Sequence, residues 1–435
     1  MGSQEQLFIK KLEISGYRSF KQVVWEPGSL NLVVGPNGSG KSNLLRFLAL
    51  ISDTVDGKLA KSITEAGGMV PILWDHQPGA FGWNISFGGC RKIEGRDYGD
   101  VTYDLTLHQI GRGSAYRIEQ DSMIFWNEPT SKFGSDDNPG YRRDGKGEVV
   151  CRFFDGDRIE DIEITDYDKN ESLISDLKGP DIKPDLQSWT IHQDIQVGPG
   201  SSIRQPTTTQ YVTKLEAGGG NLVPVLHTLY TGNRDFKKAI DEGMTAGFGG
   251  EYERLEFQPA SAQQIQLAVQ WKSSSEPHAG QDLSDGTLRF LFLLTLLAHP
   301  EPPPLVAVEE PDVGLHPSML PIIAEYAVAA SEKTQLVITS HSPEFLDAFT
   351  DCSPTVTLCH WEAGQTQLHM LEGERLQTWL DQYRLGNLFT SGDLEALALP
   401  DVDPIDEGEE PFKDLPSEDA ALSEAAGEST GGENG

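Results

Sequence analysis

The segment Gly35-Pro36-Asn37-Gly38-Ser39-Gly40-Lys41-Ser42 decides the fold. It follows a short apolar run at residues 30–34 and precedes residues 41–51, where leucines recur at helical spacing. Glycines at these positions let successive backbone N–H groups turn inward around an anion, and the following helix aims its positive end at the same point. A strand, a glycine-rich loop and a helix in this order indicate a loop that binds the phosphates of a nucleoside triphosphate.

The loop predicts both a nucleotide, ATP, and a Mg²⁺ ion. We expect Lys41 to contact the β- and γ-phosphates and the Ser42 hydroxyl to ligate Mg²⁺. A glycine turn that matches the pattern by chance is the alternative, and the flanking strand and helix argue against it. The residues expected to contact the nucleotide are Gly35, Pro36, Asn37, Gly38, Ser39, Gly40, Lys41, Ser42 and Asn43.

A second motif is an apolar run, residues 305–308, that ends in Glu309 and Glu310. Transfer of a phosphoryl group to water needs one carboxylate in the Mg²⁺ shell and another that orients or deprotonates the water. We expect Glu309 to be the metal-shell residue and Glu310 the catalytic base. An acidic strand end that faces solvent is the alternative, and it is common in so acidic a chain.

Two polar segments complete the set of candidate site residues. Leu283-Ser284-Asp285-Gly286-Thr287 precedes an apolar stretch, so Ser284 and Gly286 could present donors to a phosphate. An ordinary N-cap, made by Ser284 or Asp285, explains the same residues, and both roles are compatible. His341, at the end of another apolar run, could hydrogen-bond the γ-phosphate, although a lone histidine is usually structural.

Composition limits the classes of partner. The net charge is −33, from 34 basic and 67 acidic residues, so the chain should not bind nucleic acid through charge alone. A local basic patch at Arg142-Arg143 or Lys237-Lys238 stays open, beside the simpler interpretation of solvated surface charge. No apolar run is long enough for a membrane span, and no signal peptide is recognised. The four scattered cysteines fit a reducing cytoplasm.

The order of the motifs predicts the domain organisation. Residues 1–54 and 282–398 should form an α/β nucleotide-binding core with a mixed or parallel sheet. Residues 55–281 read as an insert with an antiparallel β lobe and a helical lobe, because short strand-like segments give way to helical ones. Residues 399–435 should be a disordered acidic tail, since residues 401–435 hold twelve acidic residues and one lysine.

These motifs resemble those of the ABC-type ATPases of the RecF/SMC/OLD group, and most closely those of the stand-alone RecF-like (AAA-type) predicted ATPases of bacteria. The resemblance extends over residues 7–397 and rests on Gly16-Tyr17-Arg18-Ser19-Phe20-Lys21, Gly35 to Leu45, Gly219-Gly220-Asn221-Leu222, Leu283 to Phe290, Glu309 to Pro317, Thr339 to Pro343 and Tyr383 to Leu388. It implies a P-loop NTPase fold, an ABC-type head with a helical signature lobe.

The resemblance also implies a mechanism. Two heads of this group sandwich two nucleotides, and each nucleotide is bound by the glycine loop of one head and the signature segment of the other. In this chain the signature segment is Leu283-Ser284-Asp285-Gly286-Thr287. Ser284 and Gly286 would then face the γ-phosphate held by the partner subunit of a homodimer. Glu310 would be the general base and His341 the switch histidine, while residues 314–317 would run along the dimer interface.

Three departures from the family pattern affect the expected rate and role. Glu309 replaces the usual aspartate of the metal shell, and the signature ends in Thr287 rather than glutamine. The glutamine loop is unclear, with Gln77 as the nearest candidate. We therefore expect slow ATP hydrolysis.

Three biological roles follow from this identification. The first is an ATP-gated switch that regulates a separate effector in phage defence, and the second is an ATPase of DNA repair or DNA binding. The third, a transporter subunit, is disfavoured by the signature. Only 94 residues follow His341, too few for the nuclease domain that OLD-type proteins carry there, so any effector should be a separate chain.

Overall fold

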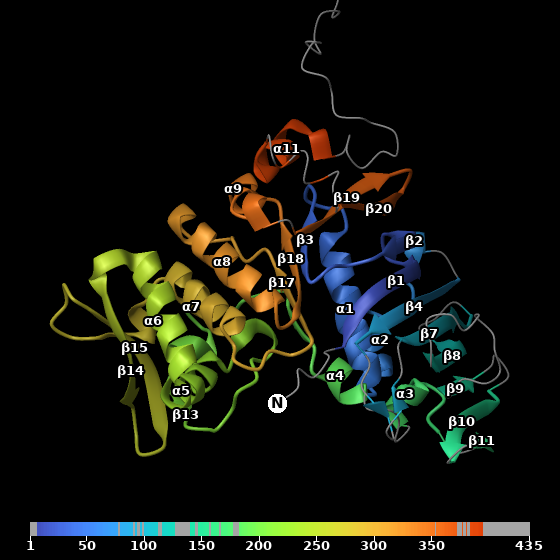
Figure 1. Ribbon diagram of the computed structural model, residues 1–435. Coiled ribbons are helices and arrows are strands. Elements are labelled where there is room, and N and C mark those ends of the chain that lie inside the picture. The colour runs from blue at the N-terminus through green and yellow to red at the C-terminus, as the bar shows by residue number, and fades with distance from the viewer. Residues whose placement is uncertain are drawn as a thin grey trace, which may run out of the picture. The chain divides into compact units, whose positions relative to one another are not determined.

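The core of the fold is a six-stranded sheet, called the core sheet below, which carries the glycine-rich loop (Figure 1). Five neighbouring strands run parallel and the last is antiparallel, which makes the sheet mixed, as predicted. In spatial order the strands are β12 (Thr190–His192), β17 (Leu305–Glu309), β18 (Gln335–Ser340), β3 (Leu30–Val34), β19 (Thr355–Glu362) and β20 (Gln365–Leu371).

Both faces of the core sheet are buried, so its parallel strands read as continuous apolar runs. Alternate side chains enter two different cores: Leu32 and Val34 of β3 belong to one, and Val33 belongs to the other. Strand geometry explains this division, because successive side chains point to opposite faces.

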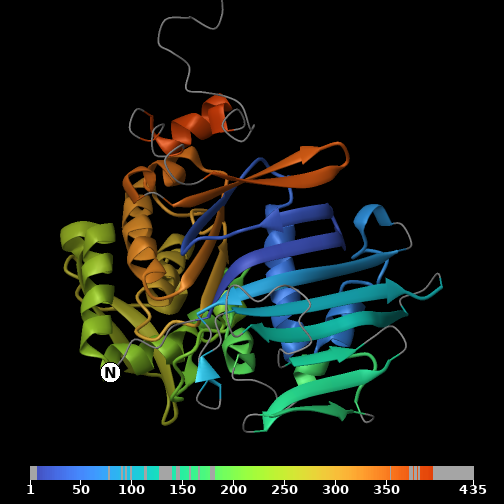
Figure 2. The ribbon, with the colours of Figure 1, turned by 45° about the vertical axis from the view of Figure 1, so that its right-hand side comes forward.

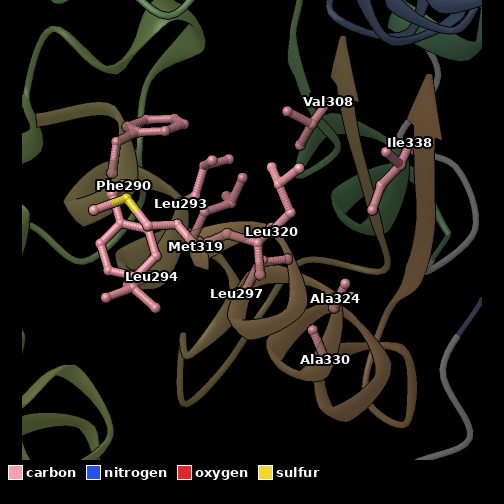
Figure 3. Close-up of a cluster of buried hydrophobic side chains, with 14 of the residues drawn as sticks. Phe290, Leu293, Leu294, Leu297, Val308, Met319, Leu320, Ala324, Ala330 and Ile338 are labelled. Atoms are coloured by element: carbon pink, nitrogen blue, oxygen red, sulfur yellow. The ribbon is translucent and has the colours of Figure 1, made fainter. Parts of the chain in front are cut away.

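Helices α5 (Leu222–Gly232), α6 (Arg234–Phe248), α7 (Asp285–Leu297) and α8 (Leu320–Ser331) supply the first core. Helix α7 is apolar nearly all round, and most of its side chains are buried. Figure 3 shows Phe290 of α7 beside Met319, and Leu293 and Leu297 of the same helix near Leu320. A small sheet completes this lobe, with strands β13 (Thr207–Thr208), β15 (Gln264–Trp271), β14 (Tyr252–Pro259) and β16 (His278–Ala279).

The second core lies between the core sheet, helix α1 (Lys41–Val55) and a larger antiparallel sheet of eight strands (Figure 2). Its strands, in spatial order, are β11 (Arg158–Glu163), β10 (Val149–Asp155), β9 (Gly140–Arg143), β8 (Tyr116–Trp126), β7 (Asp100–Gln109), β4 (Ala80–Gly88), β1 (Phe8–Tyr17) and β2 (Phe20–Trp25). Within the described residues, the other strands and α-helices are β5 (Lys92–Ile93), β6 (Arg96–Asp97), α2 (Leu59–Glu65), α3 (Leu173–Asp176), α4 (Lys183–Gln187), α9 (Pro343–Asp347) and α11 (Leu385–Ser391).

The sheet pairing crosses the predicted division between core and insert in two places. Strands β1 and β2, placed by the prediction in the nucleotide-binding core, belong to the antiparallel sheet. Strand β12, placed in the insert, pairs in parallel with β17 and completes the core sheet. Local patterns of apolar residues do not reveal these two pairings, because pairing is decided by long-range register.

Arg143 is not part of a basic surface patch, because its side chain is buried. Its Nη2 donates to Oδ2 of the buried Asp121 at 2.7 Å and to the carbonyl oxygen of Glu171 at 2.6 Å. Burial raises the pKa of Asp121, and the hydrogen bond from Arg143 opposes that shift. The pair holds the segment before α3 against strand β8.

The structure is a computed structural model that describes residues 7–76, 79–89, 92–93, 96–97, 100–111, 115–126, 140–143, 147–155, 158–164, 167–176, 182–352, 354–371, 376, 380 and 383–394. Gln77 and the acidic tail at 399–435 lie outside the described residues. Within the described part, no helix is long and apolar enough to cross a membrane.

Candidate functional site

The candidate site lies at the carboxyl edge of the core sheet. Strands β3, β17 and β18 are parallel, so the glycine loop, Glu310 and His341 all emerge at that edge. The register pairs Ser340 with Val34 and Glu309 with Thr339. Ligand sites of parallel sheets form where the strands end.

The hairpin of β19 and β20 supports the glycine loop from outside. Gly35 has a φ of +152°, and a Cβ on it would lie 2.2 Å from the carbonyl oxygen of Cys359. On the other strand of the hairpin, Thr366 donates its hydroxyl to the carbonyl oxygen of Ser39 at 2.8 Å. Only glycine fits at position 35, because both the backbone angle and the space exclude a side chain.

Lys41 is buried at the start of α1, and its ammonium group is held by the loop itself. Nζ donates to the carbonyl oxygens of Gly35 at 2.6 Å and Pro36 at 3.0 Å. Burial lowers the pKa of Lys41, and the negative charge of Glu310 opposes this shift. A positive charge is thus placed inside the loop with little solvent around it, where it acts strongly on an anion.

Ser42 and Glu309, the two predicted metal ligands, are brought into contact. The Ser42 hydroxyl donates a hydrogen bond to Oε1 of Glu309. These oxygen donors suit Mg²⁺, which typically takes one or two protein oxygens and completes its shell with phosphate and water. No group of three or more His, Cys, Asp and Glu side chains within the described residues could hold a metal by itself, and such a site does not require one.

Glu310 and His341, predicted as base and switch histidine, are hydrogen-bonded to each other. Nδ1 of His341 lies 2.8 Å from Oε1 of Glu310, and both side chains are partly exposed. Glu310 has a φ of +44°, an uncommon conformation for a residue other than glycine. Its N–H donates to the carbonyl and the hydroxyl oxygens of Thr339, both at 3.1 Å, which holds the strained backbone in place.

Ser284 has the N-cap geometry that was one of its two predicted roles. Its hydroxyl oxygen accepts a hydrogen bond from the Thr287 N–H at 3.1 Å, and Ser284 itself is exposed. Asp285 is not the cap. A Cβ on Gly286 would lie 2.8 Å from the carbonyl oxygen of Gly314, so the first turn of α7 packs closely on the segment that follows Glu310.

Comparisons with known proteins agree with this geometry. A family model described as "AAA domain, putative AbiEii toxin, Type IV TA system" matches residues 30–94 and 275–347. An SMC head bound to the C-winged helix domain of ScpA is 14% identical with a TM-score of 0.50, over 85% of this chain and 99% of that one. An SMC head with an extended coiled coil, bound to the C-terminal domain of ScpA from Pyrococcus furiosus, is 13% identical with a TM-score of 0.50, over 86% and 99%. No curated protein sequence matches the chain.

The chain has the fold of an ABC-type, SMC-like P-loop head. The predicted fold class is confirmed by the likeness to SMC heads and by the mixed core sheet. The two matched segments extend into both ends of the predicted insert. They carry the glycine loop, the signature segment, both glutamates and His341.

Two residues that lie within the quoted motifs, but were given no role of their own, make hydrogen bonds beside Glu310 and His341. Arg289 of α7 donates from Nη1 to the carbonyl oxygen of Glu310 at 3.4 Å. Burial lowers the pKa of Arg289, and Asp194 and Asp312 oppose this shift. Asp312 accepts a hydrogen bond from the Ser340 hydroxyl at 3.0 Å, and burial raises its pKa.

Gln193 is a further residue of the head that the sequence did not reveal. It directly follows β12, which runs parallel to β17 with His192 opposite Val308. Gln193 therefore leaves the core sheet at the same edge as Glu309 and Glu310, and it is partly exposed. The strand before it has three residues, too few for an alternating pattern to be recognised, so no local signal marked it.

Proposed function

We propose that the chain binds ATP, closes as a homodimer around two nucleotides and hydrolyses them slowly, and that this cycle switches a separate effector protein. One observation carries the proposal most directly: the Ser42–Glu309 contact and the Glu310–His341 hydrogen bond lie at the same sheet edge as the buried Lys41. A loop that only held phosphate would not need the carboxylates of Glu309 and Glu310 beside it.

Each residue has a separate task in hydrolysis. The backbone N–H groups of residues 37–43 surround the phosphates, and Lys41 leaves the loop carbonyls to bind the β- and γ-phosphates. Ser42 and Glu309 hold Mg²⁺, which when bound neutralises charge on the phosphate oxygens. Glu310 accepts a proton from the water that attacks the γ-phosphorus, the bond to the ADP oxygen breaks, and His341 keeps the Glu310 carboxylate oriented.

We assign the glutamine loop to Gln193 rather than to Gln77. The assignment rests on the parallel pairing of β12 with β17, which directs Gln193 toward the edge that holds both glutamates. Gln193 would then respond to the γ-phosphate and the attacking water from the side opposite the glycine loop.

Dimerisation is supported by what the head exposes next to its site. Ser284 caps α7 and faces solvent, so the positive end of a helix of thirteen residues is open to an anion from outside. Val313, in the segment after Glu310, is 45% exposed although it is apolar. A second head would cover Val313 and Gly314 while its nucleotide met Ser284 and Gly286.

The proposed effector role is supported by the comparisons rather than by the site. The description of the matching family model names a putative toxin of a toxin–antitoxin system. This description favours a role in phage defence. Two of the similar SMC heads are bound to a domain of a second protein, ScpA. A head that changes shape with ATP and recruits a separate protein fits both descriptions.

Light scattering with and without ATP tests the proposal. The Glu310→Gln variant should be a dimer with ATP and Mg²⁺ and a monomer with ADP, and Lys41→Ala should stay monomeric in both. An exclusively monomeric wild type and Glu310→Gln variant, with ATP bound, would refute the sandwich. Duplex DNA titrated across a salt series decides the alternative: ATP-dependent binding with a log–log slope of several units would favour the DNA-handling role.

A further inference from the structure

Arg204 is a buried cation that hydrogen-bonds to two residues of the signature segment. It ends a short turn at Ser202–Arg204, and its side chain is 6% exposed. Its guanidinium donates from Nη1 to the carbonyl oxygen of Leu283 at 2.6 Å, and from Nη2 to the carboxylate of Asp285. These two residues flank Ser284 in the sequence.

Further hydrogen bonds tie the same guanidinium to the surrounding backbone. Nη1 also lies 3.2 Å from the carbonyl oxygens of Gly280 and Gln281. Nε donates to the carbonyl oxygen of Val197 at 2.7 Å, in the segment that follows Gln193. The planar fork of arginine can satisfy acceptors in several directions at once, whereas a lysine ammonium is a single point charge.

We propose that Arg204 is a positioning residue, which fixes the backbone of residues 283–285 so that Ser284 and the N–H groups of α7 are ready for the nucleotide of the partner subunit. This inference rests on the proposed ATP-dependent dimer. Arg204 itself touches no reacting atom, since its contacts are Asp285 and backbone carbonyl oxygens. Donors that are fixed in advance lose no reorganisation energy when the anion arrives.

Loss of Arg204 should impair the nucleotide site of the partner subunit rather than that of its own chain. Loss of Arg204 damages the signature, which serves the partner's nucleotide, and leaves the loop and glutamates of the same chain intact. An Arg204→Met variant should therefore bind ATP with a Kd within about twofold of wild type, yet hydrolyse it at least about tenfold more slowly. Arg254→Met is the matched control, because Arg254 is paired with Glu253 and Glu256 on an exposed strand.

Mixing two inactive variants separates positioning from general loss of structure. In a heterodimer of Arg204→Met with Glu310→Gln, one of the two sites combines the intact loop and Glu310 of the first chain with the intact signature of the second. Equimolar mixing before ATP is added should recover about a quarter of the phosphate that wild type releases in the first turnover, since about half of the dimers are mixed and each has one working site. Mixing Arg204→Met with Ser284→Ala, which are both signature defects, should recover none.

Three results would overturn the inference. The first is a wild-type rate of hydrolysis by Arg204→Met. The second is a folded Arg204→Met that binds ATP but gives no recovery of phosphate release when mixed with Glu310→Gln. The third is a recovery of phosphate release when Arg204→Met is mixed with Ser284→Ala. If Arg204→Met does not fold, Arg204→Lys takes its place in the same mixtures, and a wild-type rate for it would refute the need for the fork. A wild type that binds ATP without dimerising or hydrolysing it would refute the proposed function, and the role of Arg204 with it.

Discussion

Nδ1 of His341 lies 2.8 Å from Oε1 of Glu310, although the two residues come from different strand ends. In a continuing strand, Glu309 and Glu310 would point to opposite faces of the sheet. The φ of +44° at Glu310 ends the strand and redirects its side chain. The Glu309 side chain therefore contacts Ser42, and the Glu310 side chain contacts His341.

Replacement of His341 by alanine should slow hydrolysis without weakening nucleotide binding. The Glu310 carboxylate would lose the partner that orients it, and a misplaced base typically costs about 10²-fold or more in rate. Phosphate release and ATP affinity, measured on the same preparation, check this expectation. The exposed His278 offers a control in His278→Ala, and a wild-type turnover for His341→Ala would contradict the role of the pair.

Lys41→Ala should abolish ATP binding and, with it, dimerisation. The ammonium group is buried beside the loop carbonyls, so its removal takes away the charge that we expect to bind the β- and γ-phosphates. Calorimetric titration with ATP would show no saturable heat, whereas Lys61→Ala, at an exposed position of α2, should bind normally. Micromolar ATP binding by Lys41→Ala would show that the nucleotide is held elsewhere.

Arg143→Met should strongly destabilise the fold. It would leave the buried Asp121 carboxylate without its cation, and breaking a buried ion pair typically costs about 3–5 kcal/mol. The exposed pair of Lys10 and Asp100 is the comparison, for which Lys10→Met should cost about 1 kcal/mol or less. The free energies of unfolding come from urea titrations, and equal losses for the two variants would contradict this account.

His192 should make stability depend on pH. It is buried, neither ring nitrogen has a hydrogen-bond partner among the described residues, and burial lowers its pKa to about 4. Between its ordinary pKa and about 4, the unfolded chain binds a proton that the folded chain does not. Stability should therefore fall as the pH drops through this window, by up to about 3 kcal/mol.

His192→Leu isolates that contribution from the other titrating groups. Urea unfolding of wild type and variant at several pH values from neutral to acidic should show a shallower loss of stability for the variant. His278→Leu, at an exposed position, should keep the wild-type pH dependence. Parallel curves for wild type and His192→Leu would show that His192 does not bind the proton on unfolding.

Much of the core sheet was predictable because its strands are continuous apolar runs next to recognisable loops. The runs before Gly35, Glu309 and His341 all proved to be parallel neighbours in one sheet. What the sequence did not reveal depends on distant partners. The three residues of β12 form a strand because they pair with β17. Arg143 can be buried because it forms an ion pair with Asp121 on a neighbouring strand.

In the candidate site, too, some residues could be predicted from local motifs and others could not. The residues predicted in the glycine loop and at the strand ends are brought together, because each lies within its own motif. Gln193 and Arg204 have no such motif, and their positions at the core-sheet edge and beside the signature segment arise from folding. Arg289 lies within the signature motif, but its contact with Glu310 likewise arises from folding.

Phosphate release by Glu310→Gln, measured with ATP and Mg²⁺ beside wild type, tests the central claim most directly. Wild type should release phosphate slowly and continuously. Glu310→Gln should bind ATP with unchanged affinity and release phosphate at least about 100-fold more slowly, because an amide cannot accept the proton of the attacking water. Hydrolysis by Glu310→Gln at the wild-type rate would contradict the account.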